Sequence, residues 1–411
     1  MSPYYSDSHV AWRARVRDFV EAHVIPFCDD WDVAGYPREL HVKAYEAGIG
    51  GAIFPALLGG TPPAGFDAFH ELILWDELAR CGTGGVLGHL MINAMALPPL
   101  LAHGCADAPL ADRVARGVIA GRLFISLAIS EPGAGSDVAA LATRAVRSGD
   151  SYIVNGTKKW ITGSLWADFF TLAVRTGGAG MGGLSLLLVD AKSPGISIKR
   201  IATQGGGAHN TGWVVLRDVA VPAANLIGAE GEGFKYLMTN FNHERWMIAA
   251  QAVRCARLCL SEAWAHARVR RTFGSPLLGH AVIRAKLAEV ARRVEAAQTL
   301  LEQYTYRVAC GDDDDGGNPS SSLSSSSSLG GTPLAAAAAL LKVHASVTFE
   351  FAAREASQVF GGAAVVREGP GRIVERLYRE VRATAIPGGA EEVLRDLAVR
   401  QADAKTRRAR L

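Results

Sequence analysis

A long helical seam in the C-terminal half restricts the possible folds of this chain more than any other feature. Between residues 283 and 308, apolar side chains recur at alternating steps of four and three positions: Ile283, Leu287, Val290, Val294, Ala297, Leu301, Tyr304 and Val308. This a/d-like repeat places them on one face of a helix, and it is typical of a bundle in which each helix buries that face against its neighbours. We therefore predict a helical bundle over residues 232–411.

The hydrophobic period changes along the chain, which predicts three domains. Residues 1–122 show helical spacing, as at Trp12, Val16 and Phe19. The central region instead has short β-rich runs bounded by Gly, Asn, Asp or Pro, at 123–129, 152–155, 169–174, 184–189 and 213–216. We expect an α+β protein with an N-terminal helical domain (1–122), a central small β-barrel or sheet domain (123–231) and a C-terminal helix bundle (232–411).

One segment of the bundle region cannot contribute to a core. Residues 311–331 contain four consecutive Asp and then a Ser-rich tract. Such a composition cannot bury enough apolar area to offset the entropy of ordering. We interpret this low-complexity insert as a solvated, mobile loop between two bundle helices and assign it no function.

Charge and cysteine content argue against several classes of protein. The formal net charge is +3 and the basic residues are spread along the chain, which gives no indication of nucleic-acid binding. No apolar run reaches the ~18 residues of a membrane span. The six cysteines show neither a Cys-x-x-Cys pair nor the Cys/His spacing of a zinc site. We expect no metal ion, no membrane span and a reducing compartment.

The C-terminus suggests a cellular address. The chain ends Ala409-Arg410-Leu411, which is a variant of the Ser-Lys-Leu peroxisomal signal. The N-terminus has no secretory h-region and carries Asp7 and Asp18 early, unlike an acid-poor transit peptide. We therefore predict a peroxisomal location in preference to a mitochondrial or cytoplasmic one.

Two motifs in the central region have the composition of a cofactor site. The run Ile129-Ser130-Glu131-Pro132-Gly133-Ala134-Gly135-Ser136-Asp137 leads from a strand into a Gly-rich turn, which can expose N–H groups and hydroxyls to a polar ring or phosphate. The run Lys159-Trp160-Ile161-Thr162-Gly163 places an aromatic ring beside a hydroxyl, suited to stacking on a planar cofactor. Taken singly, the first could be an ordinary loop and the second a core Trp at a strand end.

A carboxylate at the start of the bundle region lies on an apolar helix face. Leu237, Phe241, Glu244 and Ile248 fall at helical spacing, so Glu244 shares a stripe with three apolar residues. Burial of this kind raises the pKa of a carboxyl group, which suits a general base that works near neutral pH. The same position is also compatible with a buried ion pair to Arg, and the stripe alone does not separate the two interpretations.

In their order along the chain these motifs resemble the acyl-CoA dehydrogenase family. The likeness extends from about Val10 to Gln401 and includes the segments 271–274, 358–362 and 386–392. The Glu-Pro-Gly-Ala-Gly-Ser-Asp turn followed by Trp-Ile-Thr is highly specific to that family. The resemblance implies an N-terminal helical domain, a central β-domain and a C-terminal four-helix bundle, with non-covalent FAD between the β-domain and the bundle.

Roles for individual residues follow from this resemblance alone. Ser130 is expected to hydrogen-bond the flavin pyrimidine, and Ser136 to touch the pyrophosphate or the CoA moiety. Trp160 is expected to cover the ring and Thr162 to bond to N5. The other FAD contacts implied by position are Gly135, Ile161, Arg271, Phe273, Gln358, Gly361, Gly362 and Glu392. The stretches 271–273 and 358–362 are expected to reach the FAD of a neighbouring subunit, since the family is usually a dimer of dimers.

The catalytic base departs from the commonest family pattern. Many members carry a Glu two residues past the Ile of the C-terminal segment, where this chain has Gly388. The long-chain and isovaleryl branches place the Glu in a Glu-Arg pair on the first bundle helix, which Glu244-Arg245 matches. The resemblance thus implies Glu244 as the base, Arg245 and Gly389 as substrate contacts, and the Gly388 N–H as a donor to the thioester carbonyl.

The implied reaction is α,β-dehydrogenation of an acyl-CoA to trans-2-enoyl-CoA, as in the β-oxidation of fatty or branched acyl chains. The implied partners are an acyl-CoA substrate and an electron-transfer flavoprotein or oxygen as acceptor. Two other enzyme readings keep the fold: a peroxisomal acyl-CoA oxidase, and a flavin monooxygenase-like relative. A non-catalytic FAD-binding relative is a further alternative, and it would lack a plausible base or show a basic patch.

Overall fold

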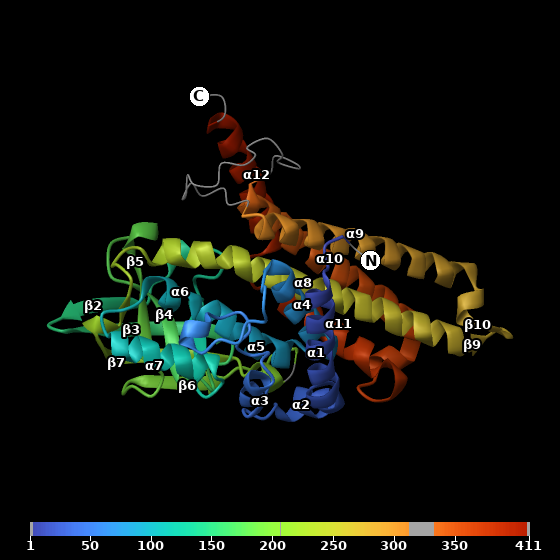
Figure 1. The fold of residues 1–411 in the computed structure, drawn as a ribbon, viewed down its shortest axis with the longest axis horizontal. Coiled ribbons are helices and arrows are strands. Elements are labelled where there is room, and N and C mark those ends of the chain that lie inside the picture. Colours follow the sequence, from blue (N-terminus) through green and yellow to red (C-terminus); the bar gives the residue numbers. More distant parts are fainter. Residues whose placement is uncertain (1–2, 206, 312–332, 409–411) are drawn as a thin grey trace. The chain divides into compact units, whose positions relative to one another are not determined.

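The computed structural model describes residues 3–205, 207–311 and 333–408 (Figure 1). The chain forms two compact units: unit 1 comprises Met1–Arg17, Gly65–Gly82 and Arg245–Leu411, and unit 2 comprises Asp18–Ala64 and Thr83–Glu244. The Asp- and Ser-rich insert predicted as a mobile loop falls outside the described residues except for Gly311, and so does the Ala409-Arg410-Leu411 ending.

Unit 2 is built on an eight-stranded sheet. Seven of its strands follow the order β6-β7-β3-β2-β4-β5-β8, and the eighth, β1, pairs in parallel with β4. The strands are β1 Ile125–Ala128, β2 Arg144–Ser148, β3 Ser151–Ile161, β4 Phe169–Arg175, β5 Leu184–Asp190, β6 Ile196–Arg200, β7 Gly212–Pro222 and β8 Leu226–Ile227. Each of the five strand runs predicted from sequence lies at a strand. The runs at 152–155 and 213–216 were too short, and β2, β6 and β8 were missed.

The sheet of unit 2 separates two apolar clusters, as the alternation of side chains along a strand requires. Phe169 and Ala173 of β4 belong to one cluster, while Phe170, Leu172 and Val174 belong to the other. Because β4 and β5 are buried on both faces, they read as continuous apolar runs. The unit also contains the helices α2 Cys28–Ala34, α3 Leu40–Glu46, α5 Gly84–Ala96, α6 Pro98–His103 and α7 Ala108–Ile119.

Unit 1 is a helical bundle centred on α10, which packs against α9, α11 and α12 (Figure 1). The helices are α4 Ala68–Leu78, α9 Ala281–Ala309, α10 Leu334–Phe360, α11 Arg372–Ala385 and α12 Glu391–Arg408. Two further helices, α1 (Asp7–His23) and α8 (Gly233–Val269), contribute residues to both units. The predicted seam is confirmed, since six of its residues are buried along α9: Leu287, Val290, Val294, Ala297, Leu301 and Tyr304.

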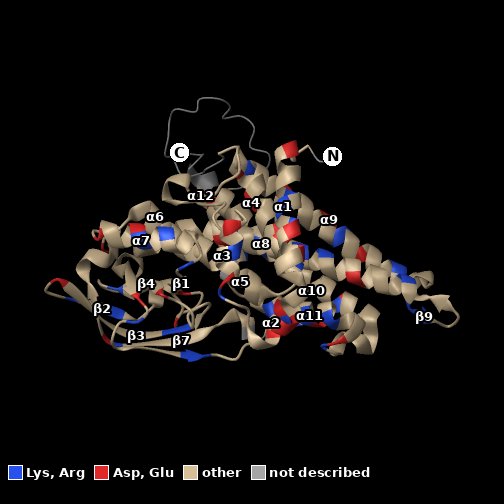
Figure 2. Cartoon of the chain, turned by 60° about the horizontal axis from the view of Figure 1, so that its bottom comes forward, with Lys and Arg blue, Asp and Glu red and all other residues tan. Residues whose placement is uncertain are grey.

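Two stretches are long and apolar enough to cross a membrane by length and composition, Gly84–His103 and Leu334–Val365. Each contains an apolar segment of 18 residues, and 65% and 56% of these two segments are buried in the structure. Packing inside the protein therefore accounts for much of their apolar character. Charges of both signs alternate along α9 (Figure 2), where Glu289 pairs with Arg292 and Arg293.

A cap of two histidines and a carboxylate begins α4. Asp67 Oδ1 accepts from the main-chain N–H groups of Phe69 and His70, at 3.0 Å each. The same oxygen lies 2.9 Å from His9 Nε2 and 2.9 Å from His70 Nδ1. These three side chains lie close enough to hold a metal ion, but their hydrogen bonds to one another and to the helix N-terminus already account for the arrangement.

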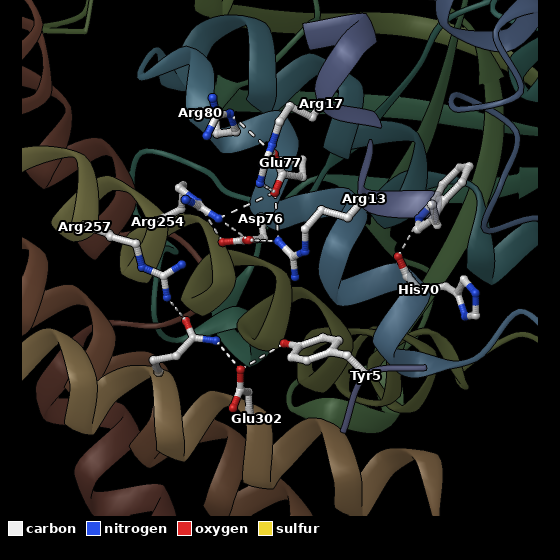
Figure 3. Close-up of polar contacts among 12 residues, drawn as sticks. Tyr5, Arg13, Arg17, His70, Asp76, Glu77, Arg80, Arg254, Arg257 and Glu302 are labelled. Atoms are coloured by element: carbon white, nitrogen blue, oxygen red, sulfur yellow. Dashed lines mark hydrogen bonds and ion pairs between the residues drawn. The ribbon is translucent and has the colours of Figure 1, made fainter. Parts of the chain in front are cut away.

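A cluster of carboxylates and guanidinium groups lies inside unit 1 (Figure 3). Asp76 and Glu77, at the end of α4, are buried. Arg13 Nη1 donates to both, at 2.7 and 2.8 Å, and Arg17 donates to Glu77 through two nitrogens. Arg254 Nε donates to Asp76 Oδ1 at 2.8 Å. The cluster therefore ties α1, α4 and α8 together through charge-assisted hydrogen bonds.

The guanidinium groups determine the charge state of Asp76. Burial alone raises the pKa of this carboxyl, but Arg254 and the other nearby arginines outweigh burial and lower the pKa to about 2. The unfolded chain therefore binds more protons than the folded protein between about pH 4 and pH 2. The stabilisation from Asp76 is complete above its ordinary pKa and is lost as the pH falls through that window.

We expect Asp76→Asn to weaken the acid dependence of stability. In wild type, Asp76 should contribute about 2 kcal/mol that disappears towards pH 2, with about half of the loss reached at pH 3. The variant should be less stable at neutral pH, because it leaves buried arginines without their partner, and its free energy of unfolding should fall less steeply below pH 4. Urea unfolding between about pH 3 and pH 6 measures both effects.

Asp112→Asn is the matched control, because Asp112 forms an exposed pair with Arg116 on α7. Such pairs contribute little, so this variant should follow the wild-type acid slope. Equal slopes for Asp76→Asn and wild type would contradict the role assigned to the cluster.

Candidate active site

The Gly-rich segment after β1 forms a narrow turn. The Glu131 N–H donates to the Ala134 carbonyl at 3.0 Å, and the Ala134 N–H donates back at 3.2 Å. At Gly133 and Gly135 an added Cβ would meet no atom within 4 Å, and the Ser136 side chain is exposed. The turn therefore leaves its main chain and hydroxyl accessible to a ligand, as the sequence predicts.

A buried ion pair fixes this turn to β3. The Lys158 ammonium, which is fully buried, donates to the Ile129 carbonyl at 2.9 Å and to Glu131 Oε1 at 2.8 Å. Burial lowers the pKa of Lys158 to about 8, although Glu131 opposes this shift. The Glu131 carboxylate also accepts the N–H groups of Ala142 and Thr143, at 2.7 and 2.9 Å. Sequence analysis did not single out this pair.

The ring of Trp160 is presented on strained backbone. Its φ is 62°, in the left-handed region that L residues rarely adopt, and its pairing to β7 is interrupted by a bulge between Lys158 and Ile161. Its side chain is 48% exposed. The Lys159 ammonium lies over the Trp160 ring at 4.8 Å and over the Trp213 ring at 4.6 Å. Strain of this kind is typical of functional sites.

The two cofactor motifs form one surface. The Lys159 N–H donates to the Ser130 carbonyl at 2.9 Å, which joins the Gly-rich turn to the segment carrying Trp160 and Thr162. This surface has accessible hydroxyls, the small residues of the Gly-rich turn and the exposed indole of Trp160. Such a combination suits a planar cofactor with a polar edge. The predicted residues Ser130, Gly135, Ser136, Trp160, Ile161 and Thr162 therefore belong to one connected region of unit 2.

The glycine run at 82–88 has a packing role. A Cβ on Gly85 would lie 2.4 Å from Ala208 Cβ and 2.8 Å from the Ala208 carbonyl carbon. The absence of a side chain thus lets α5 approach the 207–209 turn. A Cβ on Gly88 would lie 3.9 Å from Thr162 Cγ2, so α5 runs beside the predicted N5-binding residue.

The predicted base occupies an apolar environment. Glu244 is 5% exposed, and the apolar stripe expected around it is observed, since Leu237 and Ile248 are buried and Phe241 is partly buried. Its Oε1 accepts a hydrogen bond from Asn240 Nδ2 at 2.6 Å. A buried carboxylate held by a neutral amide can exchange a proton with a ligand.

Two buried cations hold the C-terminal loop of unit 1. Arg245 Nε donates to the Gly388 carbonyl at 3.0 Å, and Lys342 Nζ donates to the Gly389 carbonyl at 3.0 Å and to the Ala385 carbonyl. Burial lowers the pKa of Lys342 to about 8. Gly388 and Gly389 have φ of 72° and 118°, which only glycine adopts readily. Lys342 was not predicted from sequence.

The remaining predicted residues lie at the other end of the bundle. Arg271 and Phe273 are on the hairpin β9 (Arg271–Thr272) to β10 (Ser275–Pro276), and Phe273 is 98% exposed. Gln358, Gly361 and Gly362 are exposed where α10 ends. His266 of α8 stacks on Phe360 at 4.1 Å, which brings the two predicted segments to the same end of the bundle.

This end is far from the loop held by Arg245. The α8 helix runs unbroken from Arg245 to Val269, and its rise separates them by about 36 Å. Glu392 lies beside that loop instead, three residues after Gly389 and exposed in the first turn of α12. Within one chain, unit 1 therefore does not bring Arg271 and Phe273 together with Gly388.

Comparisons with known proteins cover almost the whole chain. Models of the N-terminal, middle and C-terminal domains of acyl-CoA dehydrogenases match residues 6–108, 126–219 and 231–402. Acyl-CoA dehydrogenase AFT10-1 of Alternaria alternata is 38% identical over 97% of this chain and 92% of its own length.

Solved structures agree with this match. A probable acyl-CoA dehydrogenase from Mycobacterium abscessus is 37% identical with a TM-score of 0.86, over 97% of this chain and 99% of that one. Butyryl-CoA dehydrogenase from Megasphaera elsdenii is 26% identical with a TM-score of 0.84, over 99% and 100% of the two chains.

These findings confirm the predicted fold class, in which helical domains flank a central sheet domain, while the exact domain boundaries stay a prediction. The family consists of FAD-dependent oxidoreductases that act on acyl-CoA. With its three domains, its Gly-rich turn tied to an exposed Trp160 and a buried Glu244, the chain is an acyl-CoA dehydrogenase family member whose cofactor is FAD.

Proposed function

We propose that this protein removes two hydrogens from the α and β carbons of an acyl-CoA to give a trans-2-enoyl-CoA, with Glu244 as the general base. The observation that carries this proposal is the position of Glu244. It is a buried carboxylate on the apolar stripe of α8, directly before the arginine that binds the Gly388 carbonyl. The family resemblance also allows a base at position 388, and there this chain has a glycine with no side chain.

The protein's own groups account for the proton-transfer half of the reaction. Glu244 takes the α proton, and its apolar surroundings limit hydration and so maintain its basicity. The main-chain N–H of Gly388 donates to the thioester carbonyl as negative charge develops there. Arg245 and Lys342 hold the Gly388 and Gly389 carbonyls, which keeps this loop preorganised. Bound FAD supplies the acceptor for the hydride from the β carbon.

The connected surface of unit 2 is proposed to hold the flavin. Ser130 and Thr162 offer hydroxyls to its polar edge, and Trp160 covers the ring. Gly135 and Ser136 suit an approaching pyrophosphate, because Gly135 leaves open space and Ser136 is exposed. Lys158 and Glu131 hold these segments in register through the Ile129 and Glu131 contacts.

We further propose a homotetramer in which the hairpin with Arg271 and Phe273 reaches a neighbouring subunit's FAD. The separation of about 36 Å along α8 supports this, as does the almost complete exposure of Phe273. A role in peroxisomal β-oxidation, with either an electron-transfer flavoprotein or oxygen as acceptor, is the matching cellular proposal. Its support is the Ala409-Arg410-Leu411 ending.

Glu244→Gln should abolish flavin reduction while FAD binding is retained. The amide is nearly isosteric but cannot accept the α proton, so the rate should fall by at least about 100-fold. Anaerobic mixing with acyl-CoAs of several lengths and branching patterns, followed by the absorbance of oxidised flavin, measures this and identifies the preferred substrate. Readmitting oxygen then tests whether oxygen serves as the acceptor.

Glu262→Gln is the control on the same helix, and it should be reduced at the wild-type rate. Flavin reduction in Glu244→Gln at the wild-type rate would show that another group is the base. Wild-type protein that retains oxidised flavin with every acyl-CoA would refute the proposed reaction.

Lys158→Met should release FAD. It leaves the buried Glu131 carboxylate without its cation, which costs about 3–5 kcal/mol of stability, and it loosens the Gly-rich turn from β3. We expect FAD affinity to fall by at least about tenfold, measured as the flavin-to-protein ratio after gel filtration and by titration of the apoprotein with FAD.

The double variant Lys158→Met/Glu131→Gln separates the effect of the unpaired charge from the loss of the contact. It removes the unpaired Glu131 charge, so much of the stability should return. The FAD affinity should stay low. Lys199→Met, an exposed lysine on β6, should bind FAD as wild type does. Unchanged FAD affinity in Lys158→Met would show that the buried pair does not support the flavin surface.

A further inference from the structure

Asn240, one helical turn before the base, joins two parts of unit 2. Its side chain is 8% exposed. Nδ2 donates to Glu244 Oε1 at 2.6 Å and to the Met95 carbonyl at 2.7 Å. Because both partners are oxygen acceptors, the nitrogen must face them, and its two hydrogens serve one acceptor each.

The Met95 carbonyl requires a donor of this kind. In a continuing helix it would accept from the N–H three or four residues later, but those residues are Pro98 and Pro99 and have no N–H. The adjacent Ala96 carbonyl is bound in the same way from outside the helix, by Thr171 Oγ1 at 2.6 Å. A buried carbonyl without a donor is costly, so the Pro-Pro step anchors the Asn240 amide.

This anchor restricts what the amide can do on its other side. With one hydrogen committed to Met95, the second is directed at a single position, where it meets Glu244 Oε1. A carboxylate that accepts from a fixed donor is held in one rotamer, and its ionised form is favoured over the protonated form. A general base needs both properties, since a protonated carboxyl cannot accept the substrate proton.

We propose that Asn240 is a positioning residue for the catalytic base: anchored on the Met95 carbonyl freed by Pro98-Pro99, its amide orients the Glu244 carboxylate and keeps it ionised. This inference rests on the proposed function of Glu244 and deepens it. The ionisable neighbours on α8, His243 and Arg245, and the rest of the site are unchanged in the variants below.

The test uses the holoenzyme with Asn240→Leu, which has a similar shape and no donors. The rate of anaerobic flavin reduction at saturating acyl-CoA, measured between about pH 5 and pH 9, should show its acid limb displaced upward by about one unit. At pH values below the limb, the rate of flavin reduction in Asn240→Leu should be about tenfold lower than in wild type. At high pH the difference between the two rates should be much smaller.

A second readout does not depend on turnover. Infrared difference spectra between each protein and its Glu244→Gln counterpart report protonation of the Glu244 carboxyl directly. The midpoint of that titration should rise in Asn240→Leu by the same amount as the kinetic limb. The two readouts together distinguish two failures. Flavin reduction in Glu244→Gln at the wild-type rate would refute Glu244 as the base. An infrared midpoint that does not move in Asn240→Leu would refute only the role of Asn240.

Thr171→Val is the matched structural control, because it removes the donor to the neighbouring Ala96 carbonyl without touching Glu244. It should lose stability comparably and leave both titrations in place. Should Asn240→Leu fail to fold, Asn240→Ser is the alternative variant. Its hydroxyl is one short donor for the Met95 carbonyl, and Glu244 loses the donor that Asn240 provided. Superimposable pH profiles for wild type and either Asn240 variant, or an equal displacement in Thr171→Val, would overturn the proposal.

Discussion

Buried polar groups that must be satisfied determine the arrangement of this protein's chemistry. A carbonyl, ammonium or carboxylate taken out of water costs several kcal/mol unless it is hydrogen-bonded. Lys158 is fully buried and satisfies the Ile129 carbonyl and Glu131, while Arg245 and Lys342 satisfy the carbonyls of the Gly388–Gly389 loop. Each of these side chains removes freedom from a segment that carries predicted site residues, so the interactions that stabilise the fold also preorganise the site.

The helix α8 carries one of these side chains, Arg245, together with Asn240 and Glu244. It is unbroken over Gly233–Val269, so the spacing of the residues along it is fixed by helical geometry. Asn240 and Glu244 are one turn apart and face the same way, whereas Arg245 is turned by about 100° and faces the C-terminal loop instead. Arg245 of this Glu-Arg pair thus holds a loop, while the proposal gives Glu244 the proton transfer. The structure shows that the Glu244 Oε1 accepts from an amide, the Asn240 Nδ2.

The sequence predicts the helices and most of the central strands because their apolar periods are long and regular, as along α9. It fails where a strand is short or exposed on one face, as in β2 and β6. Lys158 was missed because the strand was predicted to end at Asn155. Extended to Ile161, its alternation places Lys158 on the buried face with Tyr152 and Val154.

The role of Asn240 could be predicted from the sequence only in part. Its spacing to Glu244 is visible in the sequence, but the donor that the Met95 carbonyl needs is a tertiary contact between segments 145 residues apart. The family motifs predict which residues meet the cofactor. The side chains that orient those residues follow only from where main-chain groups are left without a partner, and that depends on the packing of α5, β4 and α8.

The backbone at Gly388 accounts for the glycine in the C-terminal loop and agrees with the proposed base on α8. Gly388 has a φ of 72°, and a Cβ there would lie 2.9 Å from Ile248 Cδ1 and 3.7 Å from Arg245 Cγ. Any side chain at this position would strain the backbone and displace Ile248, which belongs to the apolar stripe around Glu244. The Gly388 carbonyl could then no longer accept from Arg245 in the same geometry. A loop that wraps this closely on α8 has no room for a carboxylate of its own at position 388, which agrees with the proposal that the proton acceptor comes from the helix.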